Sequence, residues 1–364
     1  MLSHAHKLQF SKQSIRRLSI VAKPNVNNEE LSLLSVKVRA GSRFASKDGV
    51  SHLLSRFNFQ NTNNKSALRL VRESELLGGR FESTVDREFI TLKAAFLKAD
   101  LPYYLEAIGN VLYKTSFKPH ELVETVLPAA HHDLTLNNIH PINKAEDSLY
   151  NLTFRSGLGN PVYFDGVEKI SLDELKDFAN KVYTKENIII EAEGIEENDL
   201  KKFVTESVIN SLPAGSQLKA ENQSIHTGQT SRLRHVGESV AAIAIPLKLD
   251  ELPTFQVLKN YLSTDVSGLS DLITTIKLDA YSDVALFSLY VKGHDTIKVG
   301  SDIKKIISEL KKGINISSAK SFTELQASLQ SATVDVSKVK DFKLTNFNYS
   351  AVGDVTKLPY YNEL

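Results

Sequence analysis

The stretch VSHLLSR, residues 50–56, places a histidine, a serine and an arginine at the spacing of a metal-binding helix. His52 and Arg56 are four residues apart, so on a helix their side chains lie one turn apart on the same face. With Glu at Ser55 and His at Arg56, the stretch would read His-x-x-Glu-His. In that motif two imidazoles bind zinc and the carboxylate activates a bound water. The residues that are present decide whether any of this chemistry remains.

Neither replacement supports zinc catalysis. A serine hydroxyl has no usable basicity near neutral pH, so Ser55 cannot take a proton from a water molecule. The guanidinium of Arg56 stays protonated and has no free lone pair, so it repels a zinc ion. The lack of cysteine also excludes disulfides, thiolate metal sites and cysteine nucleophiles. We therefore expect His52 to be a packed or hydrogen-bonded residue of a helix that packs through Leu53 and Leu54.

No other stretch carries a stronger chemical motif. His131 and His132 are adjacent, so on a helix they point about 100° apart and rarely bind one metal ion. We expect them to be solvated or to cap a helix. Gly78 and Gly79 of the LLGG stretch favour a turn before a strand that starts near Phe81, because no lysine or helix signal of a phosphate loop follows. The sequence also lacks Gly-x-Gly-x-x-Gly, a P-loop and Gly-x-Ser-x-Gly.

Length and composition are typical of a globular protein. The 364 residues favour roughly two domains, and 41% hydrophobic with 24% charged residues is enough for a full core. The net charge of +1 gives no reason to expect nucleic-acid binding. No apolar run approaches the roughly 18 residues that a membrane-spanning helix needs. A membrane role would therefore depend on partner proteins.

The N-terminal segment is basic, contains serines and has no acidic residue before Glu29. Some of its apolar residues fall on one arc of a helical wheel, which is typical of a mitochondrial presequence. We assign residues 1–17 to it and expect cleavage near Arg16, Arg17 or Leu18. The alternatives are a disordered basic tail or, for the Arg-Arg-Leu-Ser stretch, a kinase site.

The chain repeats a strand, turn and helix plan in three places and in the same order. Such units recur in many unrelated proteins, but three in one order favour a duplication. We therefore predict an α+β protein of two related lobes, each a mixed β-sheet covered by α-helices. The matched segments are 31–59 with 240–262, 88–112 with 285–310, and 187–203 with 348–361.

Domain boundaries follow from this repeat. Residues 211–237 are polar, contain Pro213, Gly215 and Gly228, and lack a sustained apolar period, which is linker composition. We expect an N-terminal domain over 18–210 and a C-terminal domain over 238–364. The second lobe is the shorter one, because the interval between its second and third matched segments is much shorter.

The chain resembles the pitrilysin-like family of metallopeptidases and their inactive relatives. Three features carry this resemblance: the presequence, the two duplicated halves, and the position of His52 on the first helix after the first strand. The resemblance covers essentially the whole chain and implies two lobes, each a mixed sheet covered by helices. Its most specific stretches are GSRFASKDGVSHLLSRFNFQNT, the segment SALRLVRESELLGGRF with the residues after it, FRSGLGNP and FNYSAVGDV.

The resemblance also assigns the positions of the motif. His52 matches the first zinc ligand, Ser55 the general base and Arg56 the second zinc ligand. The family's distal glutamate falls near Ala129, in the stretch ELVETVLPAAHHDL. Three of the four functional positions are then lost, so we expect no catalytic residue and no bound metal. Two acids of that stretch remain without a definite place: Glu124 and Asp133.

The family includes the subunits of the mitochondrial processing peptidase and the core proteins of the cytochrome bc1 complex. The resemblance implies a non-catalytic core subunit of ubiquinol-cytochrome c reductase, without a cofactor of its own. Its location would be peripheral, on the matrix side of the mitochondrial inner membrane. The expected partners are core protein 1, cytochrome b, cytochrome c1 and other subunits of a complex that dimerises.

Two other functions compete with this prediction. One is the non-catalytic, substrate-binding subunit of the processing peptidase, which carries a glycine-rich loop in its second half. The corresponding residues here, 261–281, contain one glycine, Gly268, which counts against that function. The other is an active metallopeptidase, which the loss of ligands nearly excludes.

Overall fold

A computed structural model describes residues 19–23, 30–329, 335–337, 339 and 341–364. The expected presequence, residues 1–17, and its cleavage positions Arg16, Arg17 and Leu18 lie outside these residues. The chain divides into two compact units. The N-terminal unit contains the described residues up to 136 and residues 160–221, and the C-terminal unit contains residues 137–159 and those from 222 onward.

The N-terminal unit is built on a five-stranded mixed sheet with the order β1-β5-β2-β4-β3. β5 is parallel to β1 and antiparallel to β2, and β4 is antiparallel to both β2 and β3. The central strand β2 alternates as a half-buried strand should, and Leu34, Val36 and Val38 face the core. The strands are β1 (Ser19–Lys23), β2 (Leu31–Val38), β3 (Arg80–Val85), β4 (Ile90–Leu97) and β5 (Ile188–Glu193).

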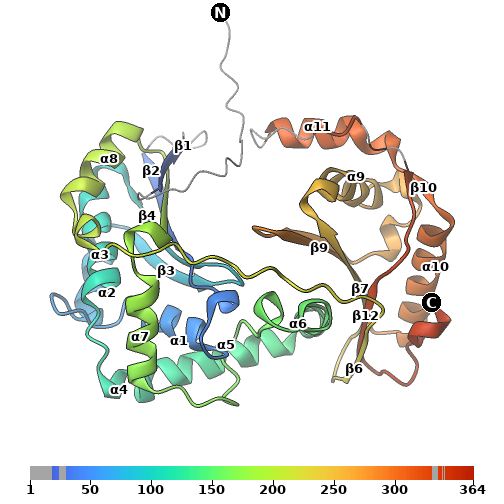
Figure 1. Ribbon diagram of the computed structural model, residues 1–364, viewed down its shortest axis with the longest axis horizontal. Coiled ribbons are helices and arrows are strands. Elements are labelled where there is room, and N and C mark those ends of the chain that lie inside the picture. Colours follow the sequence, from blue (N-terminus) through green and yellow to red (C-terminus); the bar gives the residue numbers. More distant parts are fainter. Residues whose placement is uncertain (1–18, 24–29, 330–334, 338, 340) are drawn as a thin grey trace, which may run out of the picture. The chain divides into compact units, whose positions relative to one another are not determined.

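Helices of this unit supply the rest of its core, and Figure 1 shows α2, α3 and α8 grouped on one side of the sheet. Helix α1 begins after Gly49, which has a φ of +85°, and a Cβ there would lie 2.8 Å from Phe164. Glycine is therefore required at the start of α1. The helices are α1 (Val50–Phe57), α2 (Ala67–Leu76), α3 (Leu101–Lys114), α4 (Pro119–Glu121), α5 (Leu127–Ile139), α7 (Leu172–Val182) and α8 (Glu197–Glu206), and residues 137–139 of α5 group with the other unit.

The C-terminal unit repeats this sheet with the order β6-β12-β7-β9-β8. Its parallel pair is β12 with β6, and β7 is antiparallel to β12 and β9. A separate ribbon pairs β10 (Ile314–Asn315) with β11 (Asp341–Phe342). The remaining elements are β6 (Thr230–Arg234), β7 (Ser239–Lys248), β8 (Thr275–Ala280), β9 (Val284–Gly293), β12 (Asn348–Gly353), α6 (Pro141–Phe154), α9 (Leu252–Leu262), α10 (Thr296–Lys312) and α11 (Lys320–Leu329).

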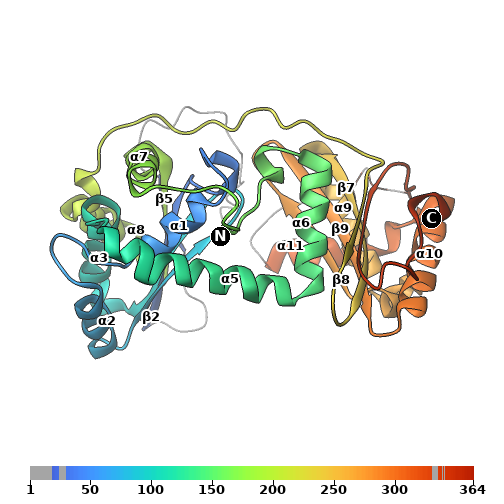
Figure 2. The ribbon, with the colours of Figure 1, turned by 90° about the horizontal axis from the view of Figure 1, so that it is seen from below.

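Helices cover both faces of the second sheet, and Figure 2 shows α6 on one side and α10 on the other. Because both faces are covered, β7 is buried along nearly its whole length and reads SVAAIAIPLK without alternation. Ala241 and Ile243 face the helices α9 and α10. The opposite face packs Val240, Ala242, Ala244, Leu286, Tyr290 and Val352 against Ala145, Leu149, Tyr150 and Phe154 of α6.

The strand order and orientation of the two sheets match element by element, so the prediction of two related α+β lobes is confirmed. All three repeated segments fall on equivalent strands. One detail differs, because the residues after Gly194 form α8 whereas no α-helix follows Gly353. A short 3-10 turn, Tyr361–Glu363, follows Pro359 there, since proline disfavours a helical conformation in the residue before it.

The domain boundaries differ from the predicted ones at two places. Residues 137–159, expected in the N-terminal domain, group with the second sheet because the apolar face of α6 packs there. The expected linker, residues 211–237, contains β6, which pairs with β12 as an edge strand. Polar composition is compatible with an edge strand, so composition alone did not separate β6 from a linker. Across the described residues, no helix combines the length and hydropathy needed to cross a bilayer.

Candidate functional site

The motif residues lie on α1, the first helix after β2, as the sequence predicts. Leu53 and Leu54 are fully buried in the core of the N-terminal unit. His52 and Arg56 occupy the face of α1 that meets α5, where both contact Asp133. Helical spacing on α1 and core packing of its leucines therefore bring the two side chains to one point.

His52 is buried, with 1% of its surface exposed, and both ring nitrogens have partners. Its Nδ1 accepts the backbone N–H of Phe164 at 3.0 Å, and Nε2 lies 2.9 Å from Oδ2 of Asp133. Because Nδ1 is an acceptor, the proton of the neutral ring is on Nε2 and is donated to Asp133. The ring packs against Tyr163 in a T-shaped arrangement, with centroids 5.0 Å apart. His52 is thus the packed, hydrogen-bonded helix residue that the sequence predicts.

Burial lowers the pKa of His52 below its ordinary value of 6.5. The hydrogen bond and the negative charge of Asp133 act in the opposite direction, and the positive charge of Arg56 adds to the lowering. The net direction fits the geometry, since protonating Nδ1 would place two N–H groups opposite each other at Phe164.

The planar guanidinium of Arg56 contacts both carboxylate oxygens of Asp133. Nε donates a hydrogen bond to Oδ2, and Nη2 forms an ion pair with Oδ1. Ser55, at the position of the general base, turns back on its own helix and donates to the carbonyl of His52 at 2.8 Å. The two replaced residues of the motif therefore make local polar contacts.

Ala129 and Asp133 lie one turn apart on α5, and only Asp133 reaches the α1 residues. Ala129, at the expected position of the family's glutamate, is partly exposed and lines a cavity with Ser55 and Arg56. Glu124 is exposed on the π-helical turn before α5. The sequence alone does not place Asp133, although its spacing of four from Ala129 puts both on one helix face.

His131 and His132 are exposed on α5, as predicted for solvated residues. The ring of His131 packs near Phe164, with centroids 5.9 Å apart. Gly78 and Gly79 form the predicted turn between α2 and β3. Gly78 has a φ of +70°, and a Cβ on Gly79 would lie 2.0 Å from the hydroxyl of Tyr104.

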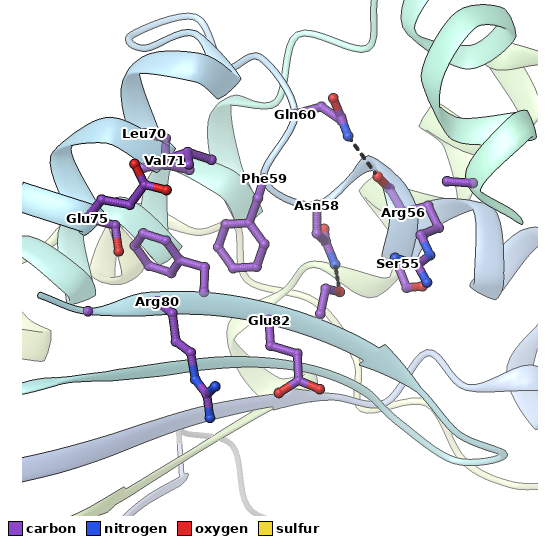
Figure 3. Close-up of a pocket in the computed structure, with 15 residues that line it drawn as sticks. Ser55, Arg56, Asn58, Phe59, Gln60, Leu70, Val71, Glu75, Arg80 and Glu82 are labelled. Atoms are coloured by element: carbon purple, nitrogen blue, oxygen red, sulfur yellow. Dashed lines mark hydrogen bonds between the residues drawn. The ribbon is translucent and has the colours of Figure 1, made fainter. Parts of the chain in front are cut away.

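A cavity of about 430 Å³ opens beside the motif and runs along the edge strand β3. Figure 3 shows Phe59, Leu70 and Val71 above β3, while Arg80 and Glu82 point away from them. The side-chain amide of Asn58 donates to Ser83 at 3.0 Å and ties the end of α1 to this strand. The cavity therefore combines an apolar wall with polar atoms from α1 and β3.

The residues at the motif do not fit a catalytic zinc ion. Such an ion needs three protein ligands and an open position for water. Among the residues that the structure describes, no group of three or more His, Cys, Asp or Glu side chains is arranged to hold a metal. His52 and Asp133 supply two donors, and the guanidinium of Arg56, which has no lone pair, engages both oxygens of the carboxylate.

Comparisons with known proteins define the class of the chain. Residues 20–166 match the insulinase family, peptidase family M16. A protease from Helicobacter pylori has the same fold, with a TM-score of 0.73 and 16% identity, and the match covers 87% of this chain and 83% of that one. The chain is thus a two-unit protein with the fold of these peptidases, which confirms the relationship predicted from the motif and the repeat.

Full-length relatives specify the family further. The chain is 53% identical over 371 residues to cytochrome b-c1 complex subunit 2, mitochondrial, of Saccharomyces cerevisiae, with complete coverage of both chains. It is 43% identical over 380 residues to the protein of the same name in Debaryomyces hansenii, again with complete coverage of both. The chain belongs to the family of mitochondrial cytochrome b-c1 complex subunit 2.

Proposed function

We propose that this chain is a non-catalytic core subunit of the mitochondrial cytochrome b-c1 complex, ubiquinol-cytochrome c reductase, in the place of core protein 2. The observation that carries the proposal is the 53% identity to subunit 2 of that complex over the full length of both chains. The subunit would support assembly and stability of an enzyme that transfers electrons from ubiquinol to cytochrome c. Electron and proton transfer would belong to its partners.

The non-catalytic part of the proposal rests on the chemistry of three side chains. Arg56 stands at a ligand position and bonds the carboxylate of Asp133, while Ser55 stands at the position of the general base and bonds its own helix. A fixed cation and a non-basic hydroxyl do not activate water on zinc. The subunit would therefore hold no cofactor of its own and would act through its surfaces.

The proposed partners are core protein 1, cytochrome b, cytochrome c1 and further subunits of the complex, which itself dimerises. Membrane association would come through these partners, with the subunit peripheral on the matrix side of the inner membrane. The basic, acid-free residues 1–17 support import into mitochondria, with cleavage near Arg16, Arg17 or Leu18.

The alternative, a substrate-binding subunit of the processing peptidase, has less support. Residues 261–281 contain a single glycine, Gly268, between two short 3-10 turns, and β8 follows directly. A segment organised in this way offers little of the backbone freedom of a glycine-rich loop. The full-length identity to the respiratory subunit also favours the first function.

Purification of the tagged full-length chain from mitochondria tests the proposal. Membranes are solubilised in a mild detergent, and the co-purifying proteins and haem spectra are recorded. We expect cytochromes b and c1, with their absorption bands, and core protein 1 in constant proportion to the tagged chain. Co-purification with a soluble matrix peptidase, without cytochromes, would contradict the proposal.

A further inference from the structure

The carboxylate of Asp133 requires a cation beside it. Only 12% of this side chain is exposed, so its charge is largely removed from water. His52 does not supply the positive charge, because its Nδ1 accepts a backbone hydrogen bond from Phe164 and its ring is neutral in this arrangement. Arg56 does supply it, through a hydrogen bond from Nε to Oδ2 and an ion pair between Nη2 and Oδ1. Charge balance at this cluster therefore depends on Arg56.

The cluster joins three separate parts of the N-terminal unit. His52 and Arg56 come from one face of α1, Asp133 comes from α5, and Phe164 lies in the segment before α7. In the His-x-x-Glu-His arrangement, the residues at positions 52 and 56 would be tied together by a shared metal ion. Here the link between α1 and α5 is the ion pair between Arg56 and Asp133 together with the hydrogen bond from His52.

We propose that the guanidinium of Arg56 is a built-in substitute for a metal ion. It stands where the side chain at position 56 would hold a metal between α1 and α5, and it neutralises Asp133 as the metal would neutralise its ligands. The cluster of His52, Arg56 and Asp133 is then a structural joint that needs no metal. This inference concerns folding, so it does not depend on membership of the respiratory complex.

Thermal unfolding of the full-length chain tests the charge relation with four variants: R56Q, D133N, R56Q/D133N and R56K. R56Q leaves a largely buried carboxylate without a cation, so its midpoint is expected to fall by roughly 4 °C. The unfolding midpoint of R56Q/D133N is expected to be closer to that of wild type, because this variant has no buried carboxylate left without a cation. R56K keeps the positive charge but lacks the planar guanidinium, so its unfolding midpoint should lie between those of R56Q and wild type.

A second experiment tests the position of the guanidinium. R56H places two imidazoles one turn apart on α1 beside Asp133, so added zinc chloride is expected to raise its unfolding midpoint, and a chelator should reverse the rise. Wild type and R56Q are expected to show no such shift. His131 and His132 remain in all variants, so zinc bound at those exposed side chains would affect all of them equally.

Three results would contradict the proposal. If R56Q is as stable as wild type, or less destabilised than R56Q/D133N, then Arg56 is not the cation that the cluster needs. If zinc raises the unfolding midpoint of wild type more than that of R56Q, and a chelator reverses the rise, the cluster is not independent of metal. If R56H unfolds at the same temperature with and without zinc, the guanidinium does not stand in the place of a metal ion.

Discussion

His52 has both ring nitrogens engaged, and this links its protonation to folding. The ring accepts the N–H of Phe164 and donates to Asp133, which suits the neutral form. Burial and the charge of Arg56 lower its pKa, and Asp133 only partly offsets them. The unfolded chain, where the ordinary value of 6.5 applies, therefore binds a proton more readily than the folded chain.

The first prediction is that acid weakens the fold through His52. A group with a lowered folded pKa stabilises the fold above its unfolded pKa, so that contribution is lost as the pH falls below 6.5 toward the folded pKa. Urea midpoints measured at pH 7.5 and pH 5.5 should differ less in H52Q than in wild type. H131Q, at an exposed position of α5, should keep the wild-type difference. An equal pH difference in H52Q and wild type would contradict the assignment.

The second prediction concerns the turn of Gly78 and Gly79. A Cβ at Gly79 would lie 2.0 Å from the hydroxyl of Tyr104 and 2.7 Å from the backbone oxygen of Ala95, so G79A must displace backbone or a fully buried ring. A Cβ at Gly78 meets nothing within 4 Å, and G78A is strained only by the φ of +70°. We expect G78A to cost about 1 kcal/mol and G79A clearly more, measured by denaturant unfolding. Equal losses would show that the contact with Tyr104 is not limiting.

At the scale of the elements, α6 differs from the other helices of the first half of the chain. It follows α5 in sequence, but its apolar residues Ala145, Leu149 and Phe154 pack on β7, β9 and β12 of the second sheet. Tyr150 on the same face donates to Asp279 at 2.8 Å, and its hydroxyl also lies 2.7 Å from that of Tyr281. α6, together with Leu158 in the turn that follows it, thus covers one face of the sheet of the C-terminal unit.

The third prediction tests that contribution. Leu149 is fully buried against the second sheet, so L149A should lower the free energy of unfolding by roughly 2–5 kcal/mol. N151A, at an exposed position of the same helix, should change it by less than about 0.5 kcal/mol. Chemical denaturation of the two variants makes the comparison, and a small effect of L149A would mean that α6 is not firmly packed.

The sequence predicts the three repeated strand pairs well because the necessary signals are local, whereas the edge strand β6 falls in the expected linker. The alternation in β2, the unbroken apolar run of β7 and the turn before β3 each lie within a short window. The sequence does not predict which sheet α6 packs on. The apolar pattern of an amphipathic helix indicates which of its faces is buried, but not which element covers that face. Asp133 was missed as a partner of Arg56 for a similar reason, because the two are 77 residues apart.

At the scale of the whole molecule, the duplication is symmetric in its sheets and asymmetric in its helices. The two sheets share order and orientation, yet the first half contributes α6 to the second unit. The units defined by packing are therefore not the two halves of the sequence. Each unit has its own core, and the motif of His52 and Arg56 lies in the N-terminal unit.

The fourth prediction is that the second half does not fold alone. A fragment of residues 222–364 would expose the apolar face of Val240, Ala242 and Leu286 that α6 covers, and is expected to aggregate. Adding residues 137–159 as a separate peptide should restore a soluble fragment with a cooperative thermal transition. The same peptide with L149D should not rescue it. Cooperative unfolding of the fragment without any peptide would contradict this prediction.

The placement of α6 also sets an order of events in synthesis. A chain that leaves the ribosome or a membrane pore with its N-terminus first presents α6 well before β7, β9 and β12 exist to receive it. For that interval the apolar face of α6 is exposed, so we expect chaperones that bind apolar segments to recognise it; in a chain truncated before residue 239 this face is never covered by the second sheet. Incomplete chains would therefore carry a permanent recognition signal for degradation, which disappears only when the C-terminal sheet is complete.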